Sequence, residues 1–340
     1  MNDPEQQLEI AINAIRKKYG ENSLRYGDEQ DAIGRISTGS LAFDYATGGG
    51  IPIGRFSRFY GGFSSCKSLT CWRIIQEAQA QGMTCAYYNI EKQYDRSLVE
   101  RIGIDSKSLM VVEGTTIEET SAKMEALLGS VDLHVVDSCS NAVSIDELNA
   151  DVADWQMGLA ARVWGKVLRR INERINSNNT VILVDQIRES MAYGGGHRVP
   201  GGRIMEHISS MSVLFRKGKW MFYDKHGNLS VDAVSSDTLS GSAEADGIEI
   251  IVKVEKSRVG RPFKTAKMYL DLNKMTFDID AERTQIAKHF KLVERSGAWY
   301  TLPSGERVQG INALREYISK NKDFQQKIDD MVRGNTDSTI

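Results

Sequence analysis

The residues best suited to chemistry lie in the stretch YGGFSSCKSLT, residues 60–70. A phosphate-binding loop has the pattern Gly, four free positions and then Gly-Lys-Ser or Gly-Lys-Thr. Gly61 begins this pattern and Lys67 and Ser68 end it, but Cys66 occupies the place of the second glycine. The stretch is therefore a nucleotide site with a tolerated substitution, a decayed site or a coincidence.

The flanking residues favour the first of these interpretations. The loop follows an apolar segment and precedes a helical pattern, where backbone N–H groups and the positive end of a helix can hold an anion. Lys67 would then reach the outer phosphates, and Ser68 would offer its hydroxyl to Mg²⁺. Cys66 directly precedes the lysine and already enters the helix, and if its backbone is right-handed helical, its small side chain need not be forbidden. Its thiol, at a helix N-terminus beside a lysine, is expected to have a lowered pKa.

Two carboxylates end apolar, strand-like segments further along the chain. Asp137 follows the apolar residues of LHVVDS, residues 133–138, where a carboxylate can bind Mg²⁺ directly or through water. Glu91 ends TCAYYNIE, residues 84–91, where it can polarise an attacking water. Taken alone, Asp137 would more readily be read as capping a turn, and Glu91 as a solvated surface residue, as most glutamates at strand ends are. Beside a phosphate loop, both become candidate catalytic groups.

The composition is that of a folded protein, with 41% hydrophobic and 26% charged residues among 340. No apolar run approaches the roughly eighteen residues of a membrane span, and the polar start MNDPEQQLEI predicts no secretory signal. The four cysteines lack metal-site spacing, so we expect buried or half-buried thiols in the cytoplasm. A net charge of −2 excludes a uniformly basic surface, so nucleic acid would be bound by local patches.

The elements that must position these residues alternate between strand and helix. Short, largely apolar strands are predicted at 55–61, 84–91, 108–114, 133–138 and 180–186. Helices are predicted at 67–82 and 157–176. This alternation predicts a doubly wound, mostly parallel α/β sheet. His134, within an apolar strand, is expected to be a satisfied core residue.

The remaining segments add elements around this core. Residues 4–19 have helical apolar spacing, and 35–55 are expected to form a turn-rich connector. Antiparallel strands at one edge of the sheet are predicted at 212–217, 248–257 and 267–272, with a hairpin at 220–231. A small C-terminal domain is expected from a fresh start at 282–293 and a helical end at 311–334.

The sequence resembles the RecA-type recombinases from about residue 6 to about residue 333. The similar segments are ISTGSLAFD before the phosphate loop, NIEKQYD around Glu91, MGLAAR in the central helix, DQIR after a later strand and GAWY near the C-terminus. Five separated matches in the same order are more specific than any single motif. The resemblance implies an α/β, RecA-like P-loop ATPase core with a mostly parallel sheet, an N-terminal helix plus linker and a small C-terminal α/β domain.

The resemblance also implies a domain organisation and an activity. The N-terminal helix and subunit-docking segment would be 1–35, the ATPase core with DNA-binding loops 36–275, and the C-terminal domain with a short tail 276–340. The implied activity is that of an ATP- and single-stranded-DNA-dependent recombinase, which forms helical filaments and catalyses homologous pairing and strand exchange. The implied cofactors are ATP and Mg²⁺. The implied partners are single- and double-stranded DNA, other copies of the chain, and a single-strand-binding or loader protein.

By the resemblance, the nucleotide site would draw on several parts of the chain. The catalytic residues would be Glu91 as base, Lys67 on the phosphates, Gln186 as sensor of the γ-phosphate, and Lys256 and Arg258 as cations that reach the ATP of a neighbouring subunit. Arg258 stands where the family usually has lysine, which keeps the charge and changes its geometry. Ser68 and Asp137 would support the metal. Residues in contact with the nucleotide would be Gly61, Gly62, Phe63, Ser64, Ser65, Cys66, Lys67, Ser68, Leu69, Pro262 and, at the adenine, Asp95.

Two loops would contact DNA by the same resemblance, at about 141–156 and 189–203. The second combines an aromatic residue, a triple glycine and cations, which suits backbone neutralisation and insertion between bases. The first carries Asp146, Glu147, Asp151 and Asp154, which would repel phosphate, and its Trp155 is either a contact or a core residue. The implied DNA contacts are Trp155, Met157, Arg162, Arg188, Ser190, Met191, Tyr193, Gly194, Gly195, His197, Arg198, Gly201, Gly202 and Arg203.

The sequence departs from the family pattern at several places. Cys66 replaces the loop glycine, Leu98 stands where bacterial members place a tyrosine that packs on adenine, and the region 217–248 is longer than usual. The chain also lacks the acidic tail of many members. These departures predict a divergent member, for instance one encoded by a bacteriophage. Two alternatives stay open: a filament that coats DNA with weak or no ATP turnover, and a ring-forming motor on the same core.

Overall fold

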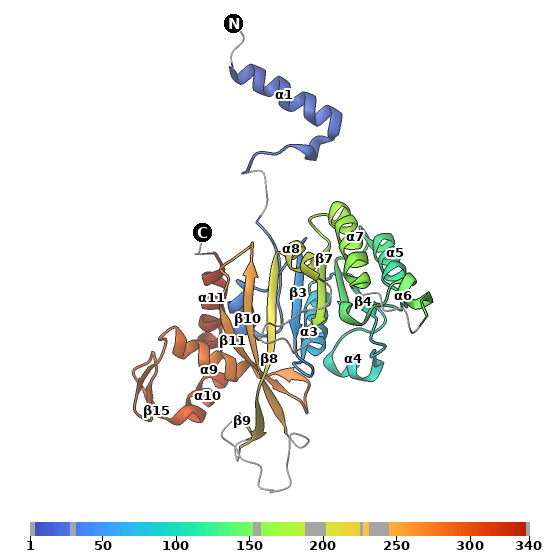
Figure 1. The fold of residues 1–340 in the computed structure, drawn as a ribbon. Coiled ribbons are helices and arrows are strands. Elements are labelled where there is room, and N and C mark those ends of the chain that lie inside the picture. The colour runs from blue at the N-terminus through green and yellow to red at the C-terminus, as the bar shows by residue number, and fades with distance from the viewer. Residues whose placement is uncertain are drawn as a thin grey trace, which may run out of the picture. The chain divides into compact units, whose positions relative to one another are not determined.

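The structure is a computed structural model that describes residues 4–27, 32–151, 158–187, 202–224, 227–230 and 245–337. The chain divides into two compact units, residues 1–34 and 35–340. Figure 1 shows the ribbon of both units, with many of their helices and strands labelled.

The N-terminal unit contains the helix that the apolar spacing predicts. Helix α1 spans Pro4–Tyr19 and is followed by Gly20, whose φ of 99° is readily adopted by glycine. A short 3-10 helix, η1 (Glu21–Ser23), comes next. Ile12 is buried, whereas other apolar side chains of α1 are well exposed, namely Leu8 (56%), Ile10 (63%) and Ile15 (37%). Within its own unit, this helix therefore leaves an apolar surface uncovered.

A ten-stranded sheet lies at the centre of the second unit among the described residues, in the order β12-β11-β10-β8-β3-β7-β6-β4-β5 with β9 paired to β8 (Figure 1). The strands predicted for its parallel part are β3 (Phe56–Gly61), β4 (Cys85–Asn89), β5 (Leu109–Val112), β6 (Leu133–Asp137) and β7 (Thr180–Gln186). All pairs from β8 to β5 run parallel. The predicted α/β core is confirmed, and β3, β4, β6 and β7 all end at one edge of the sheet.

The antiparallel strands predicted at the other side are confirmed with one correction. The strands β10 (Gly247–Ser257), β11 (Thr265–Asp271) and β12 (Thr276–Phe277) are antiparallel to their neighbours. Strand β8 (Met211–Tyr223) includes 212–217, yet it is parallel to β3 and antiparallel only to β10 and β9 (Leu229–Ser230). The prediction was wrong because alternation reports which faces are covered and not the direction of a strand. The predicted hairpin forms between β8 and β9.

Helices cover both faces of the sheet and enclose one apolar core on each. The helices on the face of Phe59 and Phe215 are α2 (Leu41–Thr47), α3 (Lys67–Ala80) and α4 (Arg96–Ile102). The helices on the face of Phe56 and Leu183 are α5 (Ile117–Leu127), α7 (Leu159–Arg174) and α8 (Gly202–Ile208). The sheet is thus doubly wound, as predicted.

The connector expected at 35–55 contains regular structure. Helix α2 lies between two short strands that pair with each other, β1 (Arg35–Ile36) and β2 (Ile51–Pro52). Ser40 caps the helix by accepting a hydrogen bond from Phe43 N at 3.2 Å. Polar and glycine residues therefore mark the ends of this helix rather than a continuous loop.

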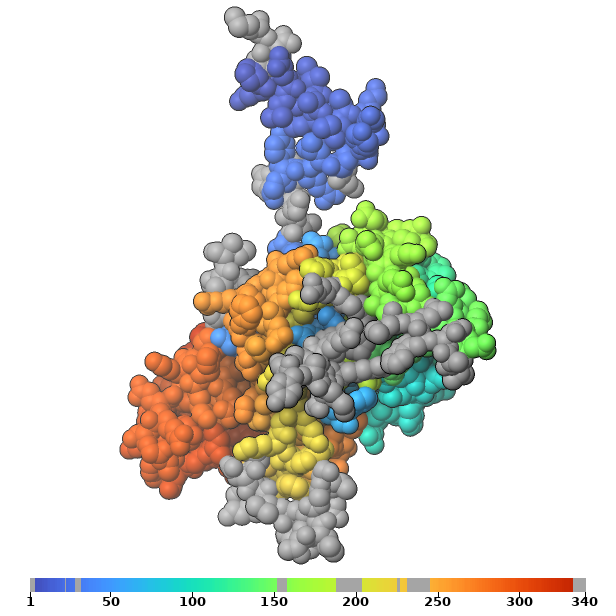
Figure 2. All heavy atoms as spheres, in the orientation of Figure 1, coloured from blue at the N-terminus to red at the C-terminus, as the bar shows by residue number. Residues whose placement is uncertain are grey.

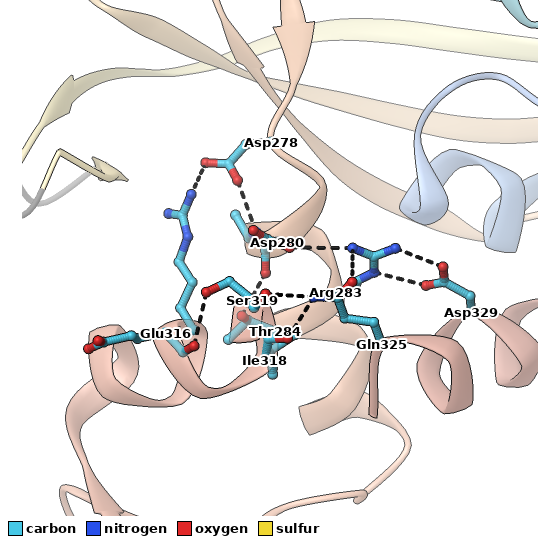
Figure 3. Close-up of polar contacts among 11 residues, drawn as sticks. Asp278, Asp280, Arg283, Thr284, Glu316, Ile318, Ser319, Gln325 and Asp329 are labelled. Atoms are coloured by element: carbon cyan, nitrogen blue, oxygen red, sulfur yellow. Dashed lines mark hydrogen bonds and ion pairs between the residues drawn. The ribbon is translucent and has the colours of Figure 1, made fainter. Parts of the chain in front are cut away.

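The C-terminal residues form a lobe with its own apolar core, drawn in orange and red in Figure 2. Its elements are α9 (Ile279–His289), β13 (Glu294–Ser296), β14 (Trp299–Thr301), β15 (Arg307–Gln309), α10 (Gly310–Lys320) and α11 (Lys322–Asp337). The helical segment predicted at 311–334 is two helices that meet at Asn321. Arg283 of α9 donates to both carboxylate oxygens of Asp329 in α11, at 3.0 and 2.8 Å (Figure 3).

Three predictions from composition can be compared with the structure. All four cysteines are free, and three are buried while Cys66 is half-buried, as expected. His134 is fully buried, its Nδ1 lies 2.9 Å from the Tyr88 hydroxyl, and burial lowers the pKa of His134 to about 4. This confirms a core histidine, but its Nε2 has no hydrogen-bond partner among the described residues, so the expectation that its polar atoms are satisfied was wrong for that nitrogen. Over the described ranges, every helix is too short or too polar to cross a bilayer.

Candidate functional site

The phosphate-loop candidate connects the end of β3 to the start of α3. A Cβ on Gly61 would lie 2.2 Å from the Phe215 carbonyl oxygen, so close pairing with β8 requires glycine at the end of β3. Ser65 is buried, and its hydroxyl donates to the Gly62 carbonyl oxygen at 2.9 Å, which closes the loop. Lys67 is the first residue of α3, so the loop backbone lies at the positive end of a 14-residue helix.

Cys66 does not have the right-handed backbone expected from the sequence. Its φ of 60° and ψ of 26° are left-handed, a conformation that costs a residue with a Cβ roughly 1–2 kcal/mol. Ser64, with φ of 54°, is a second left-handed residue of the loop. The expectation was wrong because Cys66 precedes the first helical residue and forms the turn into the helix. This position therefore favours glycine, and the loop keeps the turn with a side chain in its place.

The thiol of Cys66 also differs from the expectation of a lowered pKa. Burial raises the pKa of Cys66 to about 11, because loss of hydration outweighs the attraction of Lys67 and Lys217 for a thiolate. The side chain is half-buried and packs against the apolar core. At neutral pH the thiol is therefore protonated and acts as a small apolar group.

Lys67 points back at the loop that precedes it. Its Nζ donates to the carbonyl oxygens of Gly61 at 3.1 Å and Gly62 at 2.8 Å, and to a loop hydroxyl at 3.3 Å. The residue is 7% exposed, and burial lowers the pKa of Lys67, whereas Asp137 and Glu91 oppose this shift. The ammonium group is thus enclosed by the loop and lies in the field of both candidate carboxylates.

Asp137, at the end of β6, is joined to the beginning of α3. Burial raises the pKa of Asp137, and hydrogen bonds from Ser68 and Tyr87 oppose this shift; the Tyr87 hydroxyl donates at 2.9 Å. Hydroxyl and carboxylate oxygens are ligands that Mg²⁺ prefers. In the described part of the chain, no cluster of three or more His, Cys, Asp or Glu side chains could hold a metal ion. Ser68 and Asp137 therefore fit a Mg²⁺ ion that takes its other ligands from phosphate and water.

Glu91 lies at the centre of a hydrogen-bond network at the same edge of the sheet. Its Oε1 accepts from Asn141 Nδ2 at 2.9 Å, from Gln186 Nε2 at 2.8 Å and from the Ser138 hydroxyl. Its Oε2 accepts from Gln93 Nε2 at 2.9 Å. These four donors fix the orientation of the carboxylate. We call Glu91, Ser138, Asn141 and Gln186 the Glu91 cluster.

Gln186 connects the Glu91 cluster to the strand that leads toward residues 189–203. It is the last residue of β7, in register with Gly61 at the end of β3. Its backbone N–H donates to Ser140 Oγ at 2.8 Å, in the short helix η3 (Cys139–Asn141). Gln186, expected to sense phosphate, therefore contacts the carboxylate expected to activate water.

Asp95 is not joined to these residues by any contact within the described ranges. It is exposed and caps α4, where it accepts from Ser97 N at 2.8 Å and from Ser97 Oγ at 2.7 Å. Hydrogen bonds from Ser97 lower the pKa of Asp95. The structure shows this capping role, and the contact with adenine stays a prediction.

Lys256 and Arg258 lie at the opposite end of β3 from the phosphate loop of their own chain. Lys256 is in register with Ser212 of β8, which is in register with Arg58 in the first half of β3. Lys256 Nζ donates to two carbonyl oxygens near the C-terminal end of α8, one of them at 3.3 Å. Arg258 is exposed, and Pro262 is half-buried in the turn after β10. These cations lie two strands away from β3 and level with its first half, whereas the phosphate loop follows the end of β3. They therefore lie on a different part of the surface from the phosphate loop of their own chain.

The predicted DNA contacts fall mostly outside the described residues. Arg162 is exposed in the first turn of α7, and Gly202 and Arg203 begin α8. The acidic Asp146 and Glu147 lie in α6 (Ile145–Asn149), as part of the first candidate loop. Contacts outside the described residues are Trp155, Met157, Arg188, Ser190, Met191, Tyr193, Gly194, Gly195, His197, Arg198 and Gly201.

Several residues that hold the candidate catalytic groups were not predicted from the sequence. Ser138 and Asn141 bind Glu91, and they directly follow Asp137 at the edge where functional side chains gather, which is a usable signal. Tyr87, which binds Asp137, lies inside an apolar strand and gives no such signal.

A phosphate loop between a strand and a helix, with carboxylates at the same edge of a parallel sheet, defines the class of P-loop nucleoside triphosphatases. Sequence comparison narrows this class. The model of the RecA N-terminal domain matches residues 6–278, and that of the RecA C-terminal domain matches residues 282–337. The chain belongs to the RecA family.

Curated relatives match along almost the whole chain. Protein RecA of Bacillus subtilis (strain 168) is 30% identical over 98% of this chain and 92% of that protein. Protein RecA of Heliobacterium modesticaldum is 31% identical over 98% and 93%, and that of Mesoplasma florum 32% over 94% and 92%. Family membership supports a recombinase role in DNA recombination and repair, with DNA-dependent ATPase activity. RecA proteins in general bind ATP and depend on Mg²⁺.

Proposed function

We propose that the chain is an ATP- and single-stranded-DNA-dependent recombinase that forms helical filaments on DNA and catalyses homologous pairing and strand exchange. The proposal is carried by the contact between Glu91 Oε1 and Gln186 Nε2, at 2.8 Å. This contact joins a carboxylate suited to polarising water to the strand that leads toward residues 189–203. Chemistry at the phosphates and the order of the second DNA loop would then depend on each other.

Within this proposal each residue of the phosphate side has a separate role. Bound ATP with Mg²⁺ would supply a reactive phosphoanhydride bond whose developing charge is shared with the cation. Lys67 and the loop backbone would hold the phosphates, because Lys67 Nζ already lies over the loop. Ser68 and Asp137 would bind the cation, and Glu91 would orient and polarise the attacking water.

Assembly of several copies of the chain would give a role to Lys256, Arg258 and the exposed apolar side chains of α1. Lys256 and Arg258 lie away from the phosphate loop of their own chain, so they would complete the charge-stabilising shell of a neighbour. The exposed apolar side chains of α1 would dock on another copy. We also propose the division into 1–35, 36–275 and 276–340, which the family-model boundary between 278 and 282 supports.

The proposed DNA-binding surface consists of the loops at 141–156 and 189–203 with Arg162. Arg162 is exposed at the start of α7, where a guanidinium can neutralise a backbone phosphate. The acidic α6 would keep phosphate away from the rest of the first loop. Single- and double-stranded DNA would be the ligands, in the cytoplasm, and a loader or single-strand-binding protein would be a further partner.

The conformation of Cys66 favours a second candidate function. A left-handed residue with a side chain, at φ 60°, alters the turn that shapes the phosphate loop. A filament that coats DNA with weak ATP turnover would tolerate such a loop. The intact Glu91 cluster argues for the recombinase, since a coating protein has no need of an oriented carboxylate.

ATP hydrolysis by the purified chain, with and without single-stranded DNA at two salt concentrations, tests the proposal. We expect hydrolysis to be stimulated by DNA and the stimulation to fall as salt rises, because DNA binding through phosphates releases counterions. Absence of turnover while DNA remains bound would instead support the coating filament.

A further inference from the structure

A buried ion pair lies between two regions that the proposed function uses, the Glu91 cluster and the Lys256–Arg258 end of β10. Arg58 Nε donates to Asp185 Oδ2 at 2.9 Å, and the two side chains are 5% and 0% exposed. Arg58 is on β3 and Asp185 on the adjacent β7, where Asp185 is in register with Tyr60. Of the guanidinium nitrogens, Nη2 has no hydrogen-bond partner among the described residues. The guanidinium is thus held through Nε, and removing either partner would leave a buried charge unpaired and destabilise the fold strongly.

The Asp185 side of the pair leads directly to the Glu91 cluster. Asp185 Oδ1 accepts from Ser140 Oγ at 3.2 Å, and Ser140 Oγ accepts from the backbone N–H of Gln186 at 2.8 Å. Gln186 Nε2 in turn donates to Glu91. Because Asp185 fixes the hydroxyl that holds the Gln186 backbone, a movement of Asp185 would move the amide that contacts Glu91.

The Arg58 side leads toward β10. The guanidinium carbon lies 5.1 Å from the centre of the Tyr60 ring, and the Tyr60 hydroxyl donates to Glu255 Oε2. The register of β10 on β8 shifts between Val254 and Lys256, so Glu255 is the extra residue of a β-bulge. A bulge redirects a side chain, and here it places the residue before Lys256 on the hydroxyl of Tyr60.

Arg58 and Lys256 also belong to one row across three strands. Arg58 is in register with Ser212 of β8, and Ser212 with Lys256 of β10. In-register residues of neighbouring strands lie roughly 5 Å apart, so the two cations start from backbone positions roughly 10 Å apart with one small side chain between them. Burial lowers the pKa of Lys256 and the charge of Arg258 lowers it further, whereas Glu206 opposes this shift and Arg58 makes the smallest contribution, a lowering. The position of the Arg58 guanidinium therefore acts on Lys256 through space.

We propose that Arg58 is a positioning residue that couples the Glu91 cluster to the Lys256–Arg258 end of β10, through Asp185 and Ser140 on one side and Tyr60 and Glu255 on the other. The coupling rests on the proposed function, since it concerns DNA-stimulated ATP turnover. A subunit whose β10 cations meet a neighbour would then transmit that contact to its own Gln186 and Glu91. Hydrolysis would proceed along the assembly rather than independently in each chain.

A purely structural role makes a different prediction for neutral substitutions. Removing one partner of a buried pair destabilises a protein strongly, whereas replacing both by neutral side chains of similar volume is often harmless to stability. If the pair only holds β3 and β7 together, the double variant R58M/D185N should recover both the stability and the activity that Arg58→Met loses. If Arg58 positions catalytic groups, R58M/D185N should recover stability but not turnover.

The experiment measures kcat and KM for ATP with single-stranded DNA, together with thermal unfolding, for R58M, R58M/D185N and Tyr60→Phe. We expect R58M/D185N to unfold near the wild-type temperature, with KM unchanged and kcat reduced roughly tenfold or more, as for small displacements of catalytic groups. Tyr60→Phe removes only a half-buried hydroxyl and leaves no unpaired buried charge. It should fold normally and lower kcat with KM unchanged, which tests the β10 side even where the double variant does not fold.

The matched control is the pair Arg283–Asp329 in the C-terminal lobe, with side chains 18% and 16% exposed (Figure 3). R283M/D329N should leave kcat unchanged. Wild-type kcat in a folded R58M/D185N, or in Tyr60→Phe, would overturn the coupling and leave the proposed function intact. A wild-type chain whose hydrolysis is not stimulated by DNA would contradict the proposed function itself, and the coupling with it.

Discussion

The phosphate loop and the Glu91 cluster lie at the same edge of the sheet but are built in opposite ways. Residues 61–68 are contiguous, and the loop contains two left-handed residues with side chains, Ser64 and Cys66. The Glu91 cluster takes its members from three places between residues 91 and 186, and hydrogen bonds from Asn141 and Gln186 reach Glu91 at 2.9 and 2.8 Å. None of the four residues of the Glu91 cluster has a left-handed backbone.

The difference shows what each region can tolerate. A phosphate loop binds anions mainly with backbone N–H groups, so a side chain at the glycine position changes its energy without removing a ligand. The Glu91 cluster binds through side chains held by the register of β4, β6 and β7. One substitution there removes a specific contact. We therefore expect substitutions in the cluster to lower turnover selectively. Substitutions at loop positions that bind phosphate only through their backbone N–H groups should change activity by smaller, graded amounts.

The largest effect is expected for Lys67→Ala, which removes the side-chain charge of the loop. ATP-dependent strand exchange and DNA-stimulated hydrolysis should be abolished, a loss of at least roughly a hundredfold, because this ammonium group stabilises phosphate charge. Thermal unfolding controls for folding, since the side chain is 7% exposed and bonded to the loop. Unaltered exchange by a folded K67A protein would show that residues 61–68 are not the ATP site.

The next effect is expected for Glu91→Ala, which tests the cluster separately from the loop. ATP binding should be spared while turnover falls roughly a hundredfold or more, the usual contribution of a general base. Binding is measured with a fluorescent ATP analogue and turnover by phosphate release. Glu113 is the matched control, since it follows β5 at the same edge of the sheet and accepts from Asn89 at 2.8 Å. Lost binding in E91A, with E113A unaffected, would mean that Glu91 is structural.

A smaller and more selective effect is expected for Gln186→Ala. This change should remove most of the stimulation by DNA, roughly tenfold, and leave DNA-independent hydrolysis within a few-fold of wild type, since the loss of one hydrogen bond to a charged group costs about 1.5–3 kcal/mol. Ser138→Ala removes another donor to the same Glu91 oxygen and lies outside both proposed DNA loops and outside β7. It should lower hydrolysis equally with and without DNA. Identical behaviour of Q186A and S138A would contradict a sensing role for Gln186.

The same two regions show how much could be predicted from sequence. The phosphate loop and the elements around it, β3 and α3, follow from local apolar spacing and one contiguous motif. The ends of β4 and β6 could also be placed, which located Glu91 and Asp137 at one edge. Local patterns suffice wherever a residue's neighbours in space are its neighbours in sequence.

Features that depend on strand pairing could not be predicted in this way. The buried pair of Arg58 and Asp185 requires the register of β3 on β7, which no local pattern gives. The parallel direction of β8 depends on the path of the chain before it, and alternation is silent about direction. The left-handed backbone of Cys66 could not be predicted, because sequence places the start of a helix only to within one or two residues. A shift of one residue decides whether Cys66 is helical or belongs to the turn before the helix.

The smallest effect is expected for Cys66→Gly, which restores the phosphate-loop pattern. Relief of the left-handed strain would stabilise the fold by roughly 1–2 kcal/mol, but the greater freedom of glycine in the unfolded chain offsets roughly 0.4–1 kcal/mol of this gain. Chemical unfolding should therefore show a small increase in stability, and DNA-stimulated hydrolysis should hold or rise. Ser64→Gly is the matched control for strain, since Ser64 is equally left-handed at φ 54°.

Cys66→Ala separates the thiol from the strain, because it removes the sulfur and keeps the Cβ. If strain alone matters, C66A should resemble the wild type and C66G should exceed it. The thiol is half-buried against the core with a pKa raised to about 11, so it contributes packing and not a charge. A collapse of hydrolysis in both C66G and C66A would mean that the loop depends on this packing. The phosphate loop would then resemble the Glu91 cluster, a set of side-chain contacts and no longer a backbone site that tolerates a substitution.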